Sequence, residues 1–240
     1  IQITEAGRQF LPVAMGAISQ LAETRQAIRD TDMGDSRFVR FSVLHTISVN
    51  YLADRIEELQ IDIPDLRTRV ISDSLSSCCE LLIEGAVDIM LCYYHPSVSP
   101  RIDDDAFARK DLRSERLIPV AASEQAKQFK WNLNDKSGPP IPYLAYEQSS
   151  FLGMVVDSVV GPKQMNVETI YVDGLVETIK RRLLNGSGFA WMPETAIAAE
   201  LASEDLVPIG DESWSARLTI AALANPETLA RQPLALWDSL

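Results

Sequence analysis

Hydroxyl, phenol and imidazole side chains follow several predicted strands of this sequence, at the points where helices begin. Backbone N–H groups at a helix start are unpaired and carry a partial positive charge, so a small anion binds there readily. We expect such side chains to line a crevice at the carboxyl ends of the strands. The predicted lining residues are His45, Thr46, Ser48, Ser72, Ser74, Tyr93, Tyr146, Ser149, Ser150 and Asp173.

The serines have a second interpretation, because serine is also a preferred helix cap. Ser72, Ser74 and Ser149 would then cap helices without serving a ligand, although a cap can do both. His45 borders the predicted crevice, where its imidazole would donate to an anionic effector and make binding depend on pH. The alternative for His45 is a structural, hydrogen-bonded histidine.

Other reactive residues are weaker candidates for a functional site. Cys78, Cys79 and Cys92 are candidate redox residues, but their apolar neighbours favour burial as small hydrophobic side chains. The two histidines, His45 and His95, have no acidic cluster beside them, so no zinc site is predicted. The sequence contains no nucleophile elbow, phosphate loop or dinucleotide fingerprint. We therefore expect neither catalysis nor a cofactor.

Alternating strands and helices must position these residues, and they imply an α/β fold with a parallel sheet. A polar segment at 122–140 separates two such series, so two Rossmann-like lobes are expected. Pro193 is expected as the first residue of a helix that runs to Leu201. A final helix with Leu229 and Leu236 is expected to return to the first lobe. The predicted strands are 38–44, 66–71, 87–92, 117–121, 143–146, 170–172, 189–192, 207–209 and 218–223.

Composition excludes some classes of protein. With 46% hydrophobic and 23% charged residues, the 240-residue chain has the composition of a globular protein rather than a disordered one. No apolar stretch approaches the ~20 residues of a membrane span. The net charge of -12 repels phosphate backbones, so DNA contact would have to come from another part of the protein. Few cysteines and no visible leader fit a cytoplasmic location.

The first thirty residues predict an amphipathic helix that Thr4 would cap. Its apolar residues form a narrow seam suited to a partner helix, and an ordinary helix packed on its own domain is the alternative. The seam consists of Phe10, Ala14, Ala17, Leu21 and Ile28.

Four motifs, in this order, resemble LysR-type transcriptional regulators from the end of their winged helix-turn-helix onward. They span most of the chain and are found at residues 3–7 (Ile-Thr-Glu-Ala-Gly), 64–66 (Pro-Asp-Leu), 85–89 (Gly-Ala-Val-Asp-Ile) and 184–193. Within the family, residues 45–48, 145–153 and 188–197 resemble a hypochlorite-responsive branch. That branch is reported to sense oxidant through methionines, whereas Leu152 and Leu175 stand where two of them would align, so methionine sensing is not expected.

The resemblance implies a type-2 periplasmic-binding-protein-like fold behind a linker helix. It implies a dimerisation helix at 1–35, a first lobe at 36–121 plus 219–240, and a second lobe at 122–218. It also implies a small anion or oxidant as effector, with hypochlorite stress as one candidate cue. The expected partners are a homodimer or homotetramer and DNA, bound through a winged helix-turn-helix outside this chain, with no membrane.

Two rival functions use the same fold. A solute-binding protein of a transport system has the same two-lobed design, and an enzyme of small-molecule synthesis is a third possibility. The predicted linker helix, the missing leader and the three cysteines favour regulation over transport.

Overall fold

A computed structural model of the chain describes residues 4, 10, 38–98, 102, 106–161, 163, 165–226 and 234–240. Val39–Leu240 form one structural unit, and Ile1–Phe38 form another. The predicted linker helix, apart from Thr4 and Phe10, lies outside the described residues, as does Leu229 of the predicted final helix. The expected division into a linker and two lobes therefore stays a prediction.

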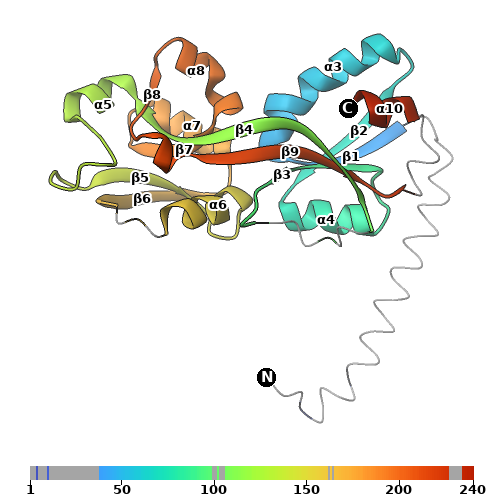
Figure 1. Cartoon of the computed structure of the whole chain (residues 1–240), viewed down its shortest axis with the longest axis horizontal. Helices are drawn as coiled ribbons and strands as arrows, with labels where there is room; N and C mark the ends of the chain where they lie inside the picture. Colours follow the sequence, from blue (N-terminus) through green and yellow to red (C-terminus); the bar gives the residue numbers. More distant parts are fainter. Residues whose placement is uncertain are drawn as a thin grey trace. The chain divides into compact units, whose positions relative to one another are not determined.

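The first half of the sheet is built by apolar strands and the helices that follow them. Strands β1 and β3 pair in parallel, with Phe41 opposite Ile89, as the β/α alternation predicts. Figure 1 shows helices α3 and α4 on opposite faces of this half. Its elements are β1 (Phe38–Leu44), α2 (His45–Ile47), the π-helix η1 (Ser48–Leu52), α3 (Ala53–Asp62), β2 (Arg67–Asp73), α4 (Leu75–Ile83) and β3 (Ile89–Tyr94).

The second half repeats the pattern. Strand β5 lies between β6 and β7 and pairs with both in parallel. Helix α6 covers one face of this half, and α7 and α8 lie on the other (Figure 1). Its elements are α5 (Ser123–Phe129), β5 (Ile141–Tyr146), α6 (Phe151–Val160), β6 (Val167–Asp173), α7 (Val176–Leu184), β7 (Phe189–Pro193), the 3-10 helix η2 (Glu194–Ile197), α8 (Ala198–Ala202), β8 (Leu206–Pro208) and the 3-10 helix η3 (Glu212–Trp214).

Two long antiparallel strands join the halves. β4 (Ala108–Ala122) pairs first with β9 (Ala216–Ala224) and then, from Leu117 onward, with β7. In the described chain the result is a nine-stranded sheet in the order β2-β1-β3-β9-β4-β7-β5-β6, with β8 added beside β4. The chain thus passes between the halves along β4 and returns along β9.

The last helix, α10 (Leu234–Ser239), packs against the first part of β4. The Lys110 ammonium on β4 donates to the carbonyl oxygens of Trp237 and Asp238, at 2.8 Å each. Arg55 of α3 donates to the carbonyl oxygen of Ser239. These contacts agree with the predicted return of the final helix to the first part of the fold.

One hydrophobic core runs through both halves. In β3, the side chains of Ile89, Met90, Leu91 and Cys92 are fully buried, which a strand covered on both faces requires. Leu117 and Val120 of β4 continue this core toward β7. Within the described ranges, none of the helices has both the length and the apolar character needed to cross a membrane.

The structure corrects three details of the sequence prediction. β4 begins at Ala108 rather than at Leu117, because its first part is a ribbon beside β9 that alternates partly buried with exposed residues. The polar segment 122–140 contains helix α5. Pro193 ends strand β7 with an extended backbone (ψ 131°), and the helical segment begins at Glu194.

Candidate functional site

Adjacent residues on β4 project to opposite faces at the point where this strand leaves β9 for β7. Glu115 pairs with Leu218 of β9, and two residues later Leu117 pairs with Pro193 of β7. Because side chains alternate along a strand, Glu115 points into the protein, where it is 3% exposed, while Arg116 stays partly exposed on the other face. A buried carboxylate therefore lies at the junction of the two halves.

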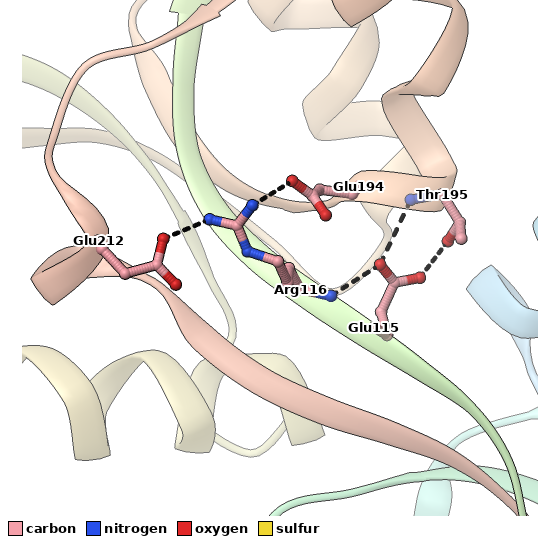
Figure 2. Close-up of polar contacts among 5 residues, drawn as sticks. All are labelled: Glu115, Arg116, Glu194, Thr195 and Glu212. Atoms are coloured by element: carbon pink, nitrogen blue, oxygen red, sulfur yellow. Dashed lines mark hydrogen bonds and ion pairs between the residues drawn. The ribbon is translucent and has the colours of Figure 1, made fainter.

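Thr195 donates two hydrogen bonds to the Glu115 carboxylate, as Figure 2 shows. The backbone N–H of Thr195 donates to Oε1 of Glu115 at 3.4 Å, and the Thr195 hydroxyl donates to Oε2. The backbone N–H of Arg116 also donates to Oε1, at 2.9 Å. Three donors thus compensate for the water that the carboxylate loses on burial.

Arg116 holds the same segment from the outer face. Its guanidinium donates to Glu194 at 3.0 Å and to Glu212 at 2.5 Å (Figure 2). Both carboxylates are at least a third exposed, so each ion pair contributes little to stability by itself. Together, Glu115 and Arg116 fix the start of η2 against β4.

Tyr93, at the end of β3, lies near the same carboxylate. Burial raises the pKa of its phenol well above the ordinary value, the charges of Glu115 and Glu177 raise it further, and a hydrogen bond with Thr195 opposes them. The ring stacks on Phe151 of α6, with ring centroids 6.0 Å apart and an interplanar angle of 27°. Tyr93 therefore links β3 of the first half to α6 of the second.

A second link between the halves runs through the π-helix. Asn50 of η1 donates from Nδ2 to Oε1 of Glu177 on α7 at 3.4 Å, and to the carbonyl oxygen of Thr46 at 2.9 Å. π-Helical turns are rare and are often found at functional sites. We call Asn50, Tyr93, Glu115, Glu177 and Thr195 the junction cluster.

Three of the predicted site residues are buried at or beside this cluster. Tyr93 belongs to it, and the carbonyl oxygen of Thr46 accepts from Asn50. Tyr146 lies deeper, where its hydroxyl donates to the carbonyl oxygen of Trp191 at 2.7 Å. Burial, followed by the influence of Tyr143, Tyr93 and Glu177, raises the pKa of the Tyr146 phenol. Tyr146 thus joins β5 to β7.

Two of the predicted site serines cap helices: Ser74, as expected, and Ser150, in place of the expected Ser149. The hydroxyl oxygen of Ser74 accepts from the N–H of Ser77 at 3.3 Å at the start of α4. Ser150, rather than Ser149, caps α6 and accepts from the N–H of Gly153 at 3.1 Å. Ser149 is exposed in the preceding turn and caps no helix.

The local sequence explains the cap at α6. The Ser150 hydroxyl donates to the carbonyl oxygen of Glu147 at 2.7 Å and closes the turn before the helix. Gly153 is required there, because a Cβ atom at this position would collide with the Glu147 carbonyl oxygen.

His45 and Ser72 form a separate pair at the surface of the first half. Nδ1 of His45 lies 2.9 Å from the Ser72 hydroxyl, and both side chains are exposed. Ser72 is on strand β2, so it does not cap a helix. Thr46 is buried and Ser48 is partly exposed in the helical run that follows His45.

Asp173 ends strand β6, where its carboxylate is held by local donors. Oδ2 accepts from the Tyr171 hydroxyl at 2.6 Å, and Oδ1 accepts from the N–H of Leu175 at 2.9 Å. The Tyr171 hydrogen bond is the main cause that lowers the pKa of Asp173. An ionised carboxylate therefore stands at the start of α7.

The three cysteines are buried thiols. Cys78 and Cys79 lie on the inner face of α4, and Cys92 lies in β3. Burial raises the pKa of Cys78 to about 11, and burial also raises the pKa of Cys92. The default expectation of buried, unreactive side chains agrees with these surroundings. Among the residues that the structure describes, no group of three or more histidine, cysteine or acidic side chains could hold a metal ion.

Sequence reasoning missed Asn50, Glu115, Glu177 and Thr195. It placed the start of β4 after Glu115, and it assigned Thr195 to the interior of a helix. One signal was present, because Glu115 lies two residues before Leu117 and would share the face of the apolar run 117–121 if the strand began earlier. A surface pocket of about 290 Å³ lies elsewhere, in the second half, and is lined by Trp131, Asn132, Asn134, Pro208, Ile209, Gly210 and Asp211.

Two α/β halves joined by crossing strands, with helices on both faces, define a periplasmic-binding-protein-like fold. Residues 34–240 match the family described as "LysR substrate binding domain". The chain belongs to this family.

Relatives and solved structures agree with this membership. The HTH-type transcriptional regulator YjiE of Escherichia coli (strain K12) is 25% identical over 209 residues, which cover 86% of this chain and 65% of YjiE. The crystal structure of VV2_1132, a LysR family transcriptional regulator, has a TM-score of 0.74 at 23% identity and covers 98% of this chain and 78% of its own. Full-length HypT from Salmonella typhimurium has a TM-score of 0.70 at 21% identity, covering 100% and 81%.

The solved structures show the same fold, and the match of residues 34–240 shows the family. The chain spans about two thirds of the length of YjiE. HypT is described as a hypochlorite-specific LysR-type transcriptional regulator, yet at 21% identity its likeness is no more specific than that of VV2_1132 at 23%. The predicted membership of the hypochlorite-responsive branch is therefore not established.

Proposed function

We propose that this chain is the effector-sensing and oligomerisation part of a LysR-type transcriptional regulator. The observation that carries the proposal is the junction cluster, in which side chains from both halves of a LysR substrate binding domain contact one another. A small molecule that contacts this cluster touches both halves at once. Its binding can therefore change their arrangement.

The proposed mechanism is a shift between two arrangements of the halves. Asn50 with Glu177, and Tyr93 with Phe151, hold the halves together in the structure. An effector that binds between these residues replaces those contacts and favours an arrangement with a different spacing of the two halves. It can shift the equilibrium only by the difference in its affinity for the two arrangements. The change would reach DNA through the winged helix-turn-helix that we expect in the whole protein.

The cue is proposed to be a small anion or an oxidant, with hypochlorite stress as one candidate. Support comes from relatives, since HypT structures include a bromide-bound regulatory domain and a hypochlorite-specific full-length protein. Direct oxidation of the three cysteines has less support, because Cys78, Cys79 and Cys92 are buried. Leu152 is also buried, and neither Leu152 nor Leu175 offers the sulfur that methionine sensing needs.

The proposed assembly is a homodimer or homotetramer. The two edge strands of the sheet, β2 and β6, carry apolar side chains that are more than a third exposed, and an exposed strand edge readily pairs with another chain. These side chains are Val70, Ile71, Ile170 and Val172. They support an interface between copies of the domain, in addition to the predicted pairing of linker helices at 1–35.

Family membership favours regulation over the rival functions. A solute-binding protein of a transport system shares the fold, but the relatives described above are transcriptional regulators. Catalysis and a cofactor form no part of the proposal. A regulator that binds promoter DNA would work in the cytoplasm.

The proposal is tested with the whole protein that contains this chain. Compounds are first screened for those that raise the unfolding temperature of the chain, because a ligand that binds only the folded state stabilises it. The affinity of the whole protein for its own promoter region is then measured by gel shift with and without each compound. A change in affinity supports the proposal. If stabilising compounds leave the DNA affinity unchanged, the proposed sensing function is wrong.

A further inference from the structure

The surface pocket of the second half lies apart from the junction cluster, because none of its lining residues belongs to that cluster. It has a volume of about 290 Å³ and lies between the turn after α5 and the segment that joins β8 to η3. Figure 1 shows α5 and β8 at the end of the second half, away from α10. The volume is at the lower limit for ligand pockets, so an occupant would be a small molecule.

Hydrogen bonds within the chain hold the two walls of this pocket together. The N–H of Leu133, which is buried after α5, donates to the carbonyl oxygen of Ile209 at 2.8 Å. The Asn134 amide donates to Asp211 at 3.0 Å and accepts from the Trp214 indole N–H at 2.8 Å. Because these contacts fix both walls, a ligand would bind with little rearrangement of the chain.

The wall after β8 is built against the buried ring of Trp214. Gly210 lies so close to this ring that a Cβ atom would come within 2.8 Å of Cδ1 of Trp214, so glycine is required there. The Lys163 ammonium lies over the same ring, 4.4 Å from its centroid. This cation is therefore engaged with the indole rather than with the pocket.

The wall after α5 supplies an aromatic surface. Trp131 lines the pocket and stacks on Phe129, with ring centroids 5.6 Å apart and an interplanar angle of 19°. Lys130 between them has a left-handed backbone (φ 52°), which ends α5 and lets the Trp131 N–H donate to the carbonyl oxygen of Ala126 at 3.1 Å. The local backbone thus presents the indole beside the polar groups of the pocket.

The polar lining of the pocket combines a free donor with a free acceptor. Oδ1 of Asn132 accepts from the N–H of Asn134 at 2.9 Å, whereas its amide nitrogen has no partner among the residues that the structure describes. The two carboxylate oxygens of Asp211 each accept one hydrogen bond, and the bonds from Ser213 are the main cause that lowers the pKa of Asp211. A carboxylate accepts about four hydrogen bonds, so Asp211 has acceptor capacity left for a ligand.

We infer that this pocket is a second ligand site, and that it binds a neutral ring carrying adjacent hydroxyl groups, as a monosaccharide or a cyclitol does. A hydroxyl group both donates and accepts, so neighbouring hydroxyls can donate to Asp211 and accept from the Asn132 amide. The apolar C–H face of such a ring can pack on Trp131. The inference does not depend on the proposed function, since the site lies outside the junction cluster.

Charged ligands match the pocket less well. The ionised Asp211 repels an anion, and none of the described lining residues is a cation that could bind one. An amine would pair with Asp211, but it offers no acceptor to the Asn132 amide. The mixed lining therefore favours hydroxyl groups over either kind of charge.

The test measures binding to this chain by titration calorimetry at constant ionic strength. The neutral probes are glucose, galactose, mannose and myo-inositol. The charged probes are glucuronate, which keeps the sugar ring, and cyclohexylamine, which keeps a six-membered ring without hydroxyls. We expect at least one neutral probe to bind saturably with one site per chain, and the two charged probes to bind at least about tenfold more weakly.

Variants assign the binding to the pocket. Asn132→Asp keeps Oδ1 as acceptor for the Asn134 N–H but replaces the free donor with an acceptor, so it should weaken binding at least about tenfold. Asn185→Asp is the matched control, because Asn185 is exposed and does not line the pocket, and it should keep the wild-type affinity. Trp131→Leu removes the aromatic surface and gives a second readout if Asn132→Asp does not fold.

The outcomes decide the inference directly. Binding of a neutral probe that Asn132→Asp or Trp131→Leu weakens, and that Asn185→Asp preserves, supports it. It is overturned if no neutral probe binds, if glucuronate or cyclohexylamine binds as tightly, or if the pocket variants retain full affinity. The proposed function is judged separately, by the effect of stabilising compounds on promoter affinity.

Discussion

Thr195 donates both its backbone N–H and its hydroxyl to the carboxylate of Glu115. The two residues are 80 positions apart in the sequence, on the start of η2 and on the crossing strand β4. Their contact fixes the first turn after β7 to the strand that joins the two halves. It also supplies two of the three donors that allow this carboxylate to stay buried at the junction.

Removing this hydroxyl should destabilise the chain. Thr195→Val keeps the side-chain shape but leaves Oε2 of Glu115 without its donor, which should lower the free energy of unfolding by about 1–3 kcal/mol. Urea denaturation measures the loss. Thr195→Ser keeps the hydroxyl and should lose less than Thr195→Val. A loss in Thr195→Ser as large as that in Thr195→Val would contradict a leading role for the hydrogen bond, because Thr195→Ser removes only the methyl group.

The helix caps can be tested on neighbouring serines. Ser150→Ala removes the acceptor for the Gly153 N–H and should lower the free energy of unfolding by about 0.5–2 kcal/mol. Ser149→Ala is the matched control and should change it by less than about 0.5 kcal/mol, because Ser149 is exposed in the turn. Denaturant midpoints of both variants give the comparison. A larger loss for Ser149→Ala would contradict the cap assignment.

Buried tyrosines should make the chain sensitive to alkali. The pKa values of Tyr93 and Tyr146 are raised in the folded state, chiefly by burial, so the folded chain keeps both protons after the unfolded chain has lost them. Their contribution to stability is complete below about pH 10 and falls as the pH rises further, by up to about 1.4 kcal/mol per pH unit for each tyrosine.

The measurement is the free energy of unfolding as a function of pH between neutral and strongly alkaline solution. Tyr93→Phe removes one of these buried phenols, so its stability should fall less steeply above about pH 10 than that of the wild type. A variant with the wild-type slope would show that Tyr93 ionises as readily in the folded chain as in the unfolded one.

The cysteines should resist modification in the folded chain. The pKa of Cys78 is raised to about 11 and that of Cys92 is also raised, both mainly by burial, so very little of either thiol is the reactive thiolate at neutral pH. Mass spectrometry after brief iodoacetamide or mild oxidant treatment should find all three cysteines unmodified, whereas the chain unfolded in urea should react. Selective modification of one cysteine in the folded chain would restore it as a redox candidate.

Much of the fold could be predicted from short-range patterns. The strand at 38–44 was predicted with its observed bounds, and the cap at Ser74 and the apolar β3 are local features that the sequence displays directly. The first part of β4 was missed, because a ribbon between Ala108 and Arg116 is stabilised by its partner β9 rather than by an apolar run of its own. The helix at 123–129 was missed because it is short and polar.

The candidate site was predictable only in part. Tyr93 directly follows the strand predicted at 87–92, and so the sequence identified it as a strand-end residue, although β3 extends to Tyr94. Glu115, Glu177 and Thr195 come from three elements whose contacts depend on how β4 crosses between the halves, and no local pattern encodes that crossing. His45 and Ser72 were expected in the crevice, and the structure pairs them with each other at the surface of the first half.

The most direct test of the account is the distance between the halves, measured with and without a stabilising compound from the screen. Spin labels on cysteines introduced at Ile61 of α3 and Phe129 of α5 report it, because both positions are exposed and lie in different halves, while the native cysteines are buried. The account predicts that the distance distribution shifts when the compound binds, and that Glu177→Gln alters the shift. A bound compound that leaves the distribution unchanged would contradict effector sensing at the junction.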